Sequence, residues 1–149
     1  MFNILSHYCS NVPYLVTGVR SGNKFYALEF FTRALPCFTE LHSLFYPVGT
    51  KIIPYNLYDI LTPVALAHLI MGDGSAQRSG LTICTDSYSV EDVVRLINVL
   101  IVRYRLECIL RYHTSTQPRI YIKEESMSLL RSIVMPYMHF SMLYKLRCR

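Results

Sequence analysis

Residues 63–75 are the stretch whose residue types and spacing suggest chemistry, because one carboxylate, Asp73, ends an otherwise apolar run. Thr62 is a good N-cap and Pro63 suits a first helical position, so the run predicts a helix. Because the run is apolar almost all round, this helix should be buried. Gly74 would end it and leave Asp73 at its foot. A carboxylate there is costly unless a positive charge meets it, commonly a metal ion, so Asp73 is the first candidate ligand.

One face of the predicted helix is suited to close packing. Ala65, His68 and Gly72 fall at positions i, i+3 and i+7, which lie on the same side of a helix. Two of the three residues are small and would let another helix approach closely. His68 is interpreted as a packing residue at this seam rather than as a catalytic base.

Read as letters, residues 66–74 are L-A-H-L-I-M-G-D-G. This nonapeptide resembles the LAGLIDADG motif of homing endonucleases and departs from it at His68, Met71 and Gly72. Further segments, in order along the chain, resemble the fungal mitochondrial, intron-encoded branch of that family: 31–36, 51–54, 61–63, 136–138 and 142–145. They extend the resemblance over nearly the whole chain. A turn after a core helix would explain Asp73 and Gly74 alone, but not the whole ordered set.

The resemblance implies metal-dependent, site-specific cleavage of double-stranded DNA. Asp73 matches the acid that binds the catalytic metal, and the carbonyl of Gly72 would be a minor ligand. Lys51 and Lys145 look like the family's basic residues that polarise water or phosphate near each metal; the alternative for each is a solvated charge. Mg²⁺ suits such a site, because it takes one or two protein carboxylates and completes its octahedron with phosphate and water. Asp86 is interpreted as a cap or turn residue rather than as a second ligand.

Turn signals and periodicity predict the other elements. A hairpin is expected around Ser21, Gly22 and Asn23, and a helix capped by Ser89, with Asp92 in place of the capping-box Glu. The full set comprises the last turns of a helix at 1–9, strands within 14–31, 80–87 and 107–123, helices at 36–46, 90–104 and 126–135, a short helical link at 56–61, a loop at 48–54 and a tail at 136–146. Together with the resemblance, these elements predict an α+β fold, with a mixed or antiparallel curved sheet and helices on one face.

Basic and polar residues are frequent on the predicted hairpins, their turns and the nearby loops. Arg and Gln on a curved ribbon of strands can contact base edges in the major groove, while Lys and Thr hold phosphates. An ordinary polar sheet face would explain any single residue as well, so the excess of Arg and Lys on both hairpins carries the interpretation. The candidate DNA-binding residues are Arg20, Lys24, Arg33, Arg78, Thr82, Thr85, Arg111, His113, Gln117, Arg119 and Lys123.

The order of elements suggests an internal repeat. The hairpin at 14–30 matches the one at 107–123 at an offset of 93 residues, and a helix, a proline and a lysine follow both. Residues 1–54 are therefore interpreted as the C-terminal part of a first repeat and 55–149 as a complete second one. In the family, two motif helices pack together and bring one acid each to DNA. We expect this chain to associate with a second such helix, from its own copy or from a separate chain, and not to be a stable, active monomer.

Composition limits the class of protein. The 149 residues suit one domain, and 15 Lys and Arg against 10 Asp and Glu give a charge of +5 that favours nucleic acid or another anionic partner. Five cysteines without short paired spacing indicate reduced thiols rather than disulfides or a zinc site. No apolar run approaches the roughly 18 residues of a membrane span. The start resembles no import peptide, so a mitochondrial protein of this kind would be made inside the organelle.

Three functions remain open at this point. The first is a homing endonuclease, in a partial or split form. The second is an RNA-binding intron maturase, because relatives of the family use the same basic sheet without hydrolysis. The third is an inactive remnant of a longer reading frame. Plasmid cleavage with Mg²⁺ would separate the first two, and aggregation on purification would indicate the third.

Overall fold

A computed structural model describes residues 2–147 of the chain. The chain divides into two compact units between residues 43 and 44, and each is described by itself. The expected repeat boundary, between 54 and 55, is a different division, and the repeat interpretation stays a prediction. Within the described part of the chain, no helix has the length and apolar character needed to cross a membrane.

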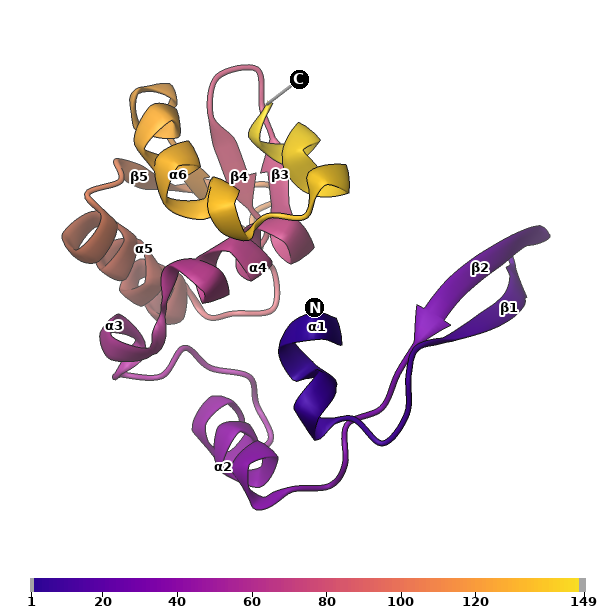
Figure 1. The fold of residues 1–149 in the computed structure, drawn as a ribbon. Helices are drawn as coiled ribbons and strands as arrows, with labels where there is room; N and C mark the ends of the chain where they lie inside the picture. Colours follow the sequence, from indigo (N-terminus) through magenta and orange to yellow (C-terminus); the bar gives the residue numbers. More distant parts are fainter. Residues whose placement is uncertain (1, 148–149) are drawn as a thin grey trace. The chain divides into compact units, whose positions relative to one another are not determined.

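The first unit contains short helices and one hairpin. Its elements are α1 (Phe2–Leu5), η1 (Ser6–Tyr8), β1 (Tyr14–Arg20), β2 (Asn23–Glu29) and most of α2 (Pro36–Phe45). The strands form a twisted antiparallel ribbon (Figure 1) in which Arg20 pairs with Asn23. Ser21 and Gly22 connect them with φ angles of 51° and 80°. A two-residue turn with two positive φ angles matches the twist of the strands, so the expected hairpin is confirmed.

The first unit buries very little. None of residues 2–43 is classed as buried, and the hairpin leaves Leu15, Tyr26 and Leu28 largely exposed. Leu41 on α2 is 50% exposed. Edge-to-face ring contacts, such as that between Phe2 and Phe30 with centroids 5.3 Å apart, supply part of its packing. The first unit therefore leaves many of its large apolar side chains exposed.

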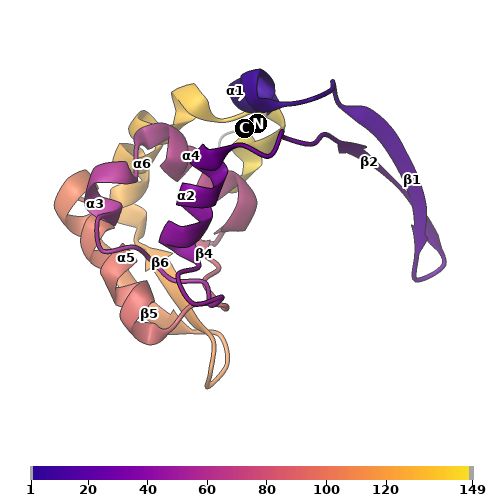
Figure 2. The same cartoon turned by 90° about the horizontal axis from the view of Figure 1, so that it is seen from below.

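The second unit contains a four-stranded sheet and most of the helices. Its elements are α3 (Leu57–Ile60), α4 (Pro63–Asp73), β3 (Gly74–Ala76), β4 (Leu81–Ile83), α5 (Val90–Tyr104), β5 (Cys108–Tyr112), β6 (Pro118–Ile122), η2 (Glu124–Ser126), α6 (Met127–Val134), η3 (Met135–Tyr137) and η4 (Phe140–Leu146). The strand order is β3-β4-β6-β5, and every pair is antiparallel. The loop between β5 and β6 projects from the body of this unit (Figure 2).

The core lies between one face of this sheet and the helices. Alternate strand residues, including Leu81, Ile83 and Ile120, are fully buried, and α5 packs against β5 and β6. Their neighbours in the strands point to the other face, as the two-residue period of a strand requires. This opposite face carries Thr82, Arg111 and other polar side chains, so the expected α+β arrangement with helices on one face is present.

The helix that contains Asp73 is buried on one side only, which differs from the expectation of a helix buried all round. Leu66 and Ile70 are fully buried, whereas Ala65, Gly72 and Asp73 are exposed. The Thr62 hydroxyl accepts a hydrogen bond from the Ala65 N–H at 3.2 Å, which confirms the N-cap.

Gly74 ends α4 for a reason that the sequence did not indicate. Its φ of −75° and ψ of 143° are extended, not left-handed, and the chain passes directly into β3. A Cβ on Gly74 would lie 2.5 Å from the carbonyl oxygen of Ile70. The glycine is thus required for close approach of the backbone. β3 was not expected, and the predicted strand at 80–87 is only the three residues of β4.

Candidate active site and nucleic-acid interface

The carboxylate of Asp73 is exposed at the C-terminal end of α4. Its backbone carbonyl accepts a hydrogen bond from the Cys84 N–H at 2.9 Å, which joins the helix end to the segment after β4. Within residues 2–147, its side chain makes no hydrogen bond or ion pair at bonding distance. The C-terminal end of a helix is the negative end of its dipole. The Asp73 carboxylate adds a further negative charge, so this end of α4 attracts cations.

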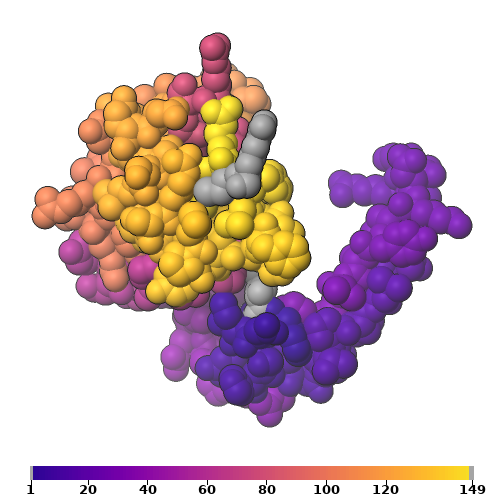
Figure 3. Space-filling model, turned by 45° about the horizontal axis from the view of Figure 1, so that its top comes forward, coloured from indigo at the N-terminus to yellow at the C-terminus, as the bar shows by residue number. Residues whose placement is uncertain are grey.

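Lys145 supplies one positive charge at this helix end. Its Nζ donates to the carbonyl oxygens of Met71 at 2.6 Å and of Gly72 at 3.3 Å. The side chain comes from η4, which is held in place by the buried Leu146, whose carbonyl accepts a hydrogen bond from Arg131 Nε at 3.0 Å. Figure 3 shows α6 and η4 as a continuous part of the surface of this unit. Lys145 therefore contacts the same Gly72 carbonyl that was expected to be a minor metal ligand.

Lys51 supplies a second positive charge near Asp73. Its ammonium lies 4.5 Å from the centroid of the Tyr88 ring. Hydrogen bonding with Tyr88 raises the pKa of Lys51 above its ordinary value, against the lowering effect of burial, and the charge of Asp73 adds to the rise. The lysine is therefore protonated at neutral pH, and the two charges attract each other.

The loop that carries Lys51 is fixed on α5 by a buried carboxylate. Asp92 is 6% exposed, and its Oδ1 accepts hydrogen bonds from the Ile53 N–H at 3.2 Å and from Arg95 at 2.6 Å. Its other oxygen accepts from the Ser89 hydroxyl at 3.0 Å. Ser89 caps α5 as expected, but Asp92 does not complete a reciprocal capping box, because its carboxylate binds the distant Ile53 backbone instead.

These groups fit a divalent cation that keeps most of its ligands from substrate and water. The end of α4 offers one carboxylate and adjacent carbonyl oxygens, a hard-oxygen donor set that suits Mg²⁺. In the described part of the chain, no cluster of three or more His, Cys, Asp or Glu side chains forms a closed metal cage. Asp73 and the Gly72 carbonyl would hold such a cation, and phosphate and water would complete its coordination.

The open face of the sheet carries two arginines in directly paired positions. Arg111 on β5 pairs with Arg119 on β6. The Arg111 guanidinium lies 3.4 Å from the centroid of the Tyr121 ring, which makes a cation–π contact. Arg119 forms two hydrogen bonds with Asp86, at 2.8 and 2.7 Å. These bonds lower the pKa of Asp86. Asp86 is thus an ion-pair partner that orients Arg119.

The other predicted DNA-binding residues differ in their availability. Thr85 does not fit the prediction, because it is 2% exposed and its hydroxyl donates to the Pro118 carbonyl at 2.6 Å. Lys123 forms an ion pair with Glu107 at 2.9 Å, and Arg33 donates to the carbonyl of His7 at 2.6 Å. The side chains of the second unit that stay on its open face, adjoining loop or β5–β6 turn are Arg78, Thr82, Arg111, His113, Gln117 and Arg119, while Arg20 and Lys24 lie near the hairpin turn of the first unit.

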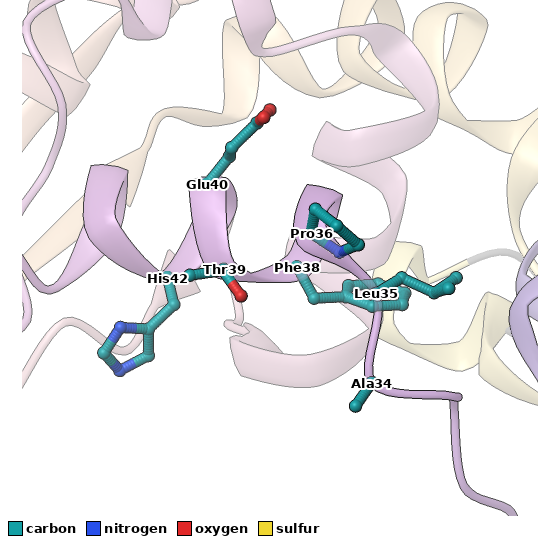
Figure 4. Close-up of a pocket in the computed structure, with 7 residues that line it drawn as sticks. All are labelled: Ala34, Leu35, Pro36, Phe38, Thr39, Glu40 and His42. Carbon is teal, nitrogen blue, oxygen red and sulfur yellow. The ribbon is translucent and has the colours of Figure 1, made fainter.

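A cavity of about 840 Å³ lies elsewhere, along α2 and the residues before it. Figure 4 shows its lining residues, with Glu40 and His42 extending from different sides of the helix. These two polar side chains do not converge on one ligand, and the lining includes neither Asp73 nor either lysine. The cavity is therefore not the candidate active site.

The model of the LAGLIDADG DNA endonuclease family matches residues 1–130. This chain belongs to that family. The matched range contains residues 66–74, so the resemblance to this family inferred from the sequence is confirmed.

Some relatives of this LAGLIDADG chain are named endonucleases, and others are named mRNA maturases. The intron-encoded endonuclease ai4 of Dictyostelium discoideum is 32% identical over 151 residues, covering 97% of this chain and 95% of that protein. The cytochrome b mRNA maturase bI2 of Debaryomyces hansenii is 32% identical over 142 residues, and that of Saccharomyces cerevisiae is 35% identical over 149 residues. This chain spans 54% and 35% of these two maturases.

A solved structure has the same α+β fold. The homing endonuclease I-WcaI, bound to its DNA recognition sequence, matches with a TM-score of 0.87 and 27% identity, over 97% of this chain and 68% of that one. The endonuclease fold expected from the sequence is therefore confirmed, while the division into one and a half repeats stays a prediction.

Sequence reasoning missed two residues near the functional groups of this LAGLIDADG chain. Tyr88 was not considered, although it contacts Lys51. Asp86 lies in a turn, in agreement with its interpretation as a cap or turn residue, but its ion pair with Arg119 was not anticipated. Both lie in the polar segment between β4 and α5, and an acid two residues before a tyrosine in such a segment has no distinctive pattern.

Proposed function

We propose that this chain is a site-specific endonuclease that hydrolyses double-stranded DNA with Mg²⁺ or another divalent cation. One observation carries the proposal: α4 ends in the exposed carboxylate of Asp73, and the carbonyls just before it, of Met71 and Gly72, bind the ammonium of Lys145. The charge of Asp73 also contributes to the raised pKa of Lys51. This is the charge pattern that phosphodiester hydrolysis requires, since both the attacking water and the scissile phosphate need stabilisation.

Each group has a distinct task in this proposal. Asp73 and the Gly72 carbonyl would hold the cation, which would supply charge neutralisation and lower the pKa of water. Lys145 neutralises the scissile phosphate from the helix end, and Lys51 polarises water or phosphate beside Asp73. The open sheet face binds the duplex, with Arg111 and Arg119 directed to base edges and neighbouring polar residues to phosphates.

The test is the change of Asp73 to Asn. The amide keeps the shape of the side chain and removes its metal-binding charge, so we expect cleavage to be abolished while DNA binding is largely kept. The substrate is a plasmid that carries a duplex selected by the wild-type protein from a randomised library. Asp59→Asn is the matched control, because Asp59 is an exposed acid on α3, and it should cut at the wild-type rate. Nicking by Asp73→Asn at the wild-type rate with Mg²⁺ would show that Asp73 is not the ligand.

A second motif helix completes the proposed enzyme. Ala65 and Gly72 are exposed, and a Cβ on Gly72 would meet no atom within 4 Å. Together with the half-buried His68, Ala65 and Gly72 form a face of α4 on which a partner helix can pack closely. One acid acts on one strand, so a double-strand cut needs a second acid. The partner is either a copy of this chain or another LAGLIDADG chain.

RNA binding is the second candidate function, and the names of two relatives favour it. The proteins from Debaryomyces hansenii and Saccharomyces cerevisiae are both named cytochrome b mRNA maturases. In this alternative, the basic sheet binds intron RNA and Asp73 is dispensable. Splicing of a cognate intron that survives Asp73→Asn, with no plasmid cleavage by the wild type, would favour the maturase over the endonuclease.

The same relatives support a mitochondrial location, because they are named as maturases of cytochrome b mRNA. We propose that the protein acts in mitochondria. Detection of the protein in a protease-protected mitochondrial fraction would test this proposal.

A further inference from the structure

Lys51 lies on a loop whose backbone is held in place, but its own side chain is long and flexible. Next along the loop, the N–H of Ile53 donates to Asp92, and its carbonyl accepts from Arg95 at 2.5 Å. These bonds hold the loop on α5. They leave the lysine stem free to rotate, and a lysine side chain has several flexible bonds. Another contact is needed to keep its ammonium near Asp73.

Tyr88 provides that contact. The Lys51 Nζ lies 4.5 Å from the centroid of its ring, within the range of a cation–π interaction. Tyr88 is half-buried and packs against the hydrophobic core, so its ring is held by neighbours other than Lys51. A ring fixed in this way restricts an otherwise mobile cation.

The segment that carries Tyr88 is tied to Asp73. The Tyr88 N–H donates to the Thr85 carbonyl at 3.0 Å, which closes a turn. The buried Thr85 hydroxyl anchors that turn on Pro118 of β6. One residue earlier, the Cys84 N–H donates to the carbonyl of Asp73. One short segment therefore connects the acid and the ring that contacts Lys51.

We propose that Tyr88 is a positioning residue for DNA cleavage, whose ring holds the Lys51 ammonium beside Asp73. The inference rests on the proposed function, in which Lys51 acts on water or phosphate. Tyr88 touches neither DNA nor metal in this scheme. It restricts the orientations of Lys51 before the substrate arrives, and such preorganisation lowers the activation barrier without strengthening DNA binding.

The test is a double-mutant cycle with Tyr88→Leu and Lys51→Met, measured by single-turnover cleavage of the selected plasmid with Mg²⁺. Tyr88→Leu should slow cleavage about 3- to 30-fold, the range that a cation–π contact supplies, with DNA affinity within about twofold of wild type. In the Lys51→Met background, the same change should have no further effect. Tyr88→Phe keeps the ring but loses the hydroxyl that hydrogen-bonds with Lys51, so it should cut faster than Tyr88→Leu.

The matched control is Tyr58→Leu. Like Tyr88, Tyr58 on α3 has a cation over its ring, the guanidinium of Arg103, which lies 5.5 Å from the ring centroid. This variant should cut like wild type. Thermal unfolding of each variant identifies any loss of fold, and Tyr88→Met, which also lacks the ring, replaces Tyr88→Leu in the cycle if that variant does not fold. Equal slowing by Tyr88→Leu with and without Lys51 would overturn the inference, as would wild-type cleavage by Tyr88→Leu.

The same experiment separates this inference from the proposed function. If Lys51→Met cuts normally while Asp73→Asn does not cut, the positioning role fails and the endonuclease stands. If Asp73→Asn cuts normally, the proposed active site itself is wrong.

Discussion

Two glycines near Asp73 should respond in opposite ways to the same substitution. A Cβ on Gly74 would lie 2.5 Å from the backbone oxygen of Ile70 and 3.0 Å from its Cγ2. The φ of Gly74 is −75°, which alanine adopts without strain, so the whole cost is steric. The oxygen belongs to the backbone of α4 and cannot move alone, and we expect Gly74→Ala to destabilise the protein by about 1–3 kcal/mol.

Gly72 lies two residues before Gly74 and faces open space. A Cβ there meets no atom within 4 Å, and Gly72 is helical, where alanine is favoured over glycine. Gly72→Ala should therefore stabilise the monomer by about 0.5 kcal/mol. Gly72→Leu should leave monomer unfolding nearly unchanged but weaken any assembly through α4, because a large side chain would keep a partner helix away.

Thermal and urea unfolding at low protein concentration measure the stability of Gly74→Ala and Gly72→Ala. Sedimentation over a range of concentrations measures the assembly of Gly72→Leu. Gly74→Ala should melt about 3–10 °C below wild type. Equal melting of Gly74→Ala and wild type would refute the close-approach argument. An assembly that is as tight with Gly72→Leu as with wild type would show that no helix packs on this face.

Four further outcomes are expected. The logarithm of DNA affinity should fall steeply and linearly with the logarithm of salt concentration, because basic residues release phosphate counterions; a flat dependence would argue against nucleic acid. Asp86→Asn removes the negative charge and one of the two acceptor oxygens that orient Arg119, so binding selections should show relaxed preference at one base position, and unchanged selectivity would contradict this role. The lowered pKa of Asp86 means that the ion pair is complete above the ordinary aspartate range and is lost as pH falls through the lowered value, which NMR titration of its carboxyl would detect. Burial raises the pKa of Cys108 to about 12, so its thiol stays protonated at pH 8, and iodoacetamide should modify the exposed Cys37 far faster; equal rates would show that Cys108 is accessible.

The sequence by itself determined the elements whose causes are local. Thr62 and Pro63 predicted the first residue of α4 correctly, and Ser89 predicted the first residue of α5. The turn at Ser21 and Gly22 set the register of the first hairpin. Caps and tight turns depend on a few neighbouring residues, so their chemistry is readable without the fold. The nonapeptide at 66–74 likewise indicated the family, because its letters and order are specific.

The tertiary structure alone decided which side chains meet. Lys145 reaches a carbonyl 74 residues away, and Lys51 lies near Asp73 although its loop shows no periodicity. Asp92 looked like part of a helix cap and proved to be an anchor for the loop of Lys51. Thr85 looked exposed and is buried. Such contacts join segments distant in sequence, and their free energy comes from burial and geometry that no local pattern encodes. The open face of α4 follows from the same cause, since only packing shows which side of an apolar helix this chain leaves uncovered.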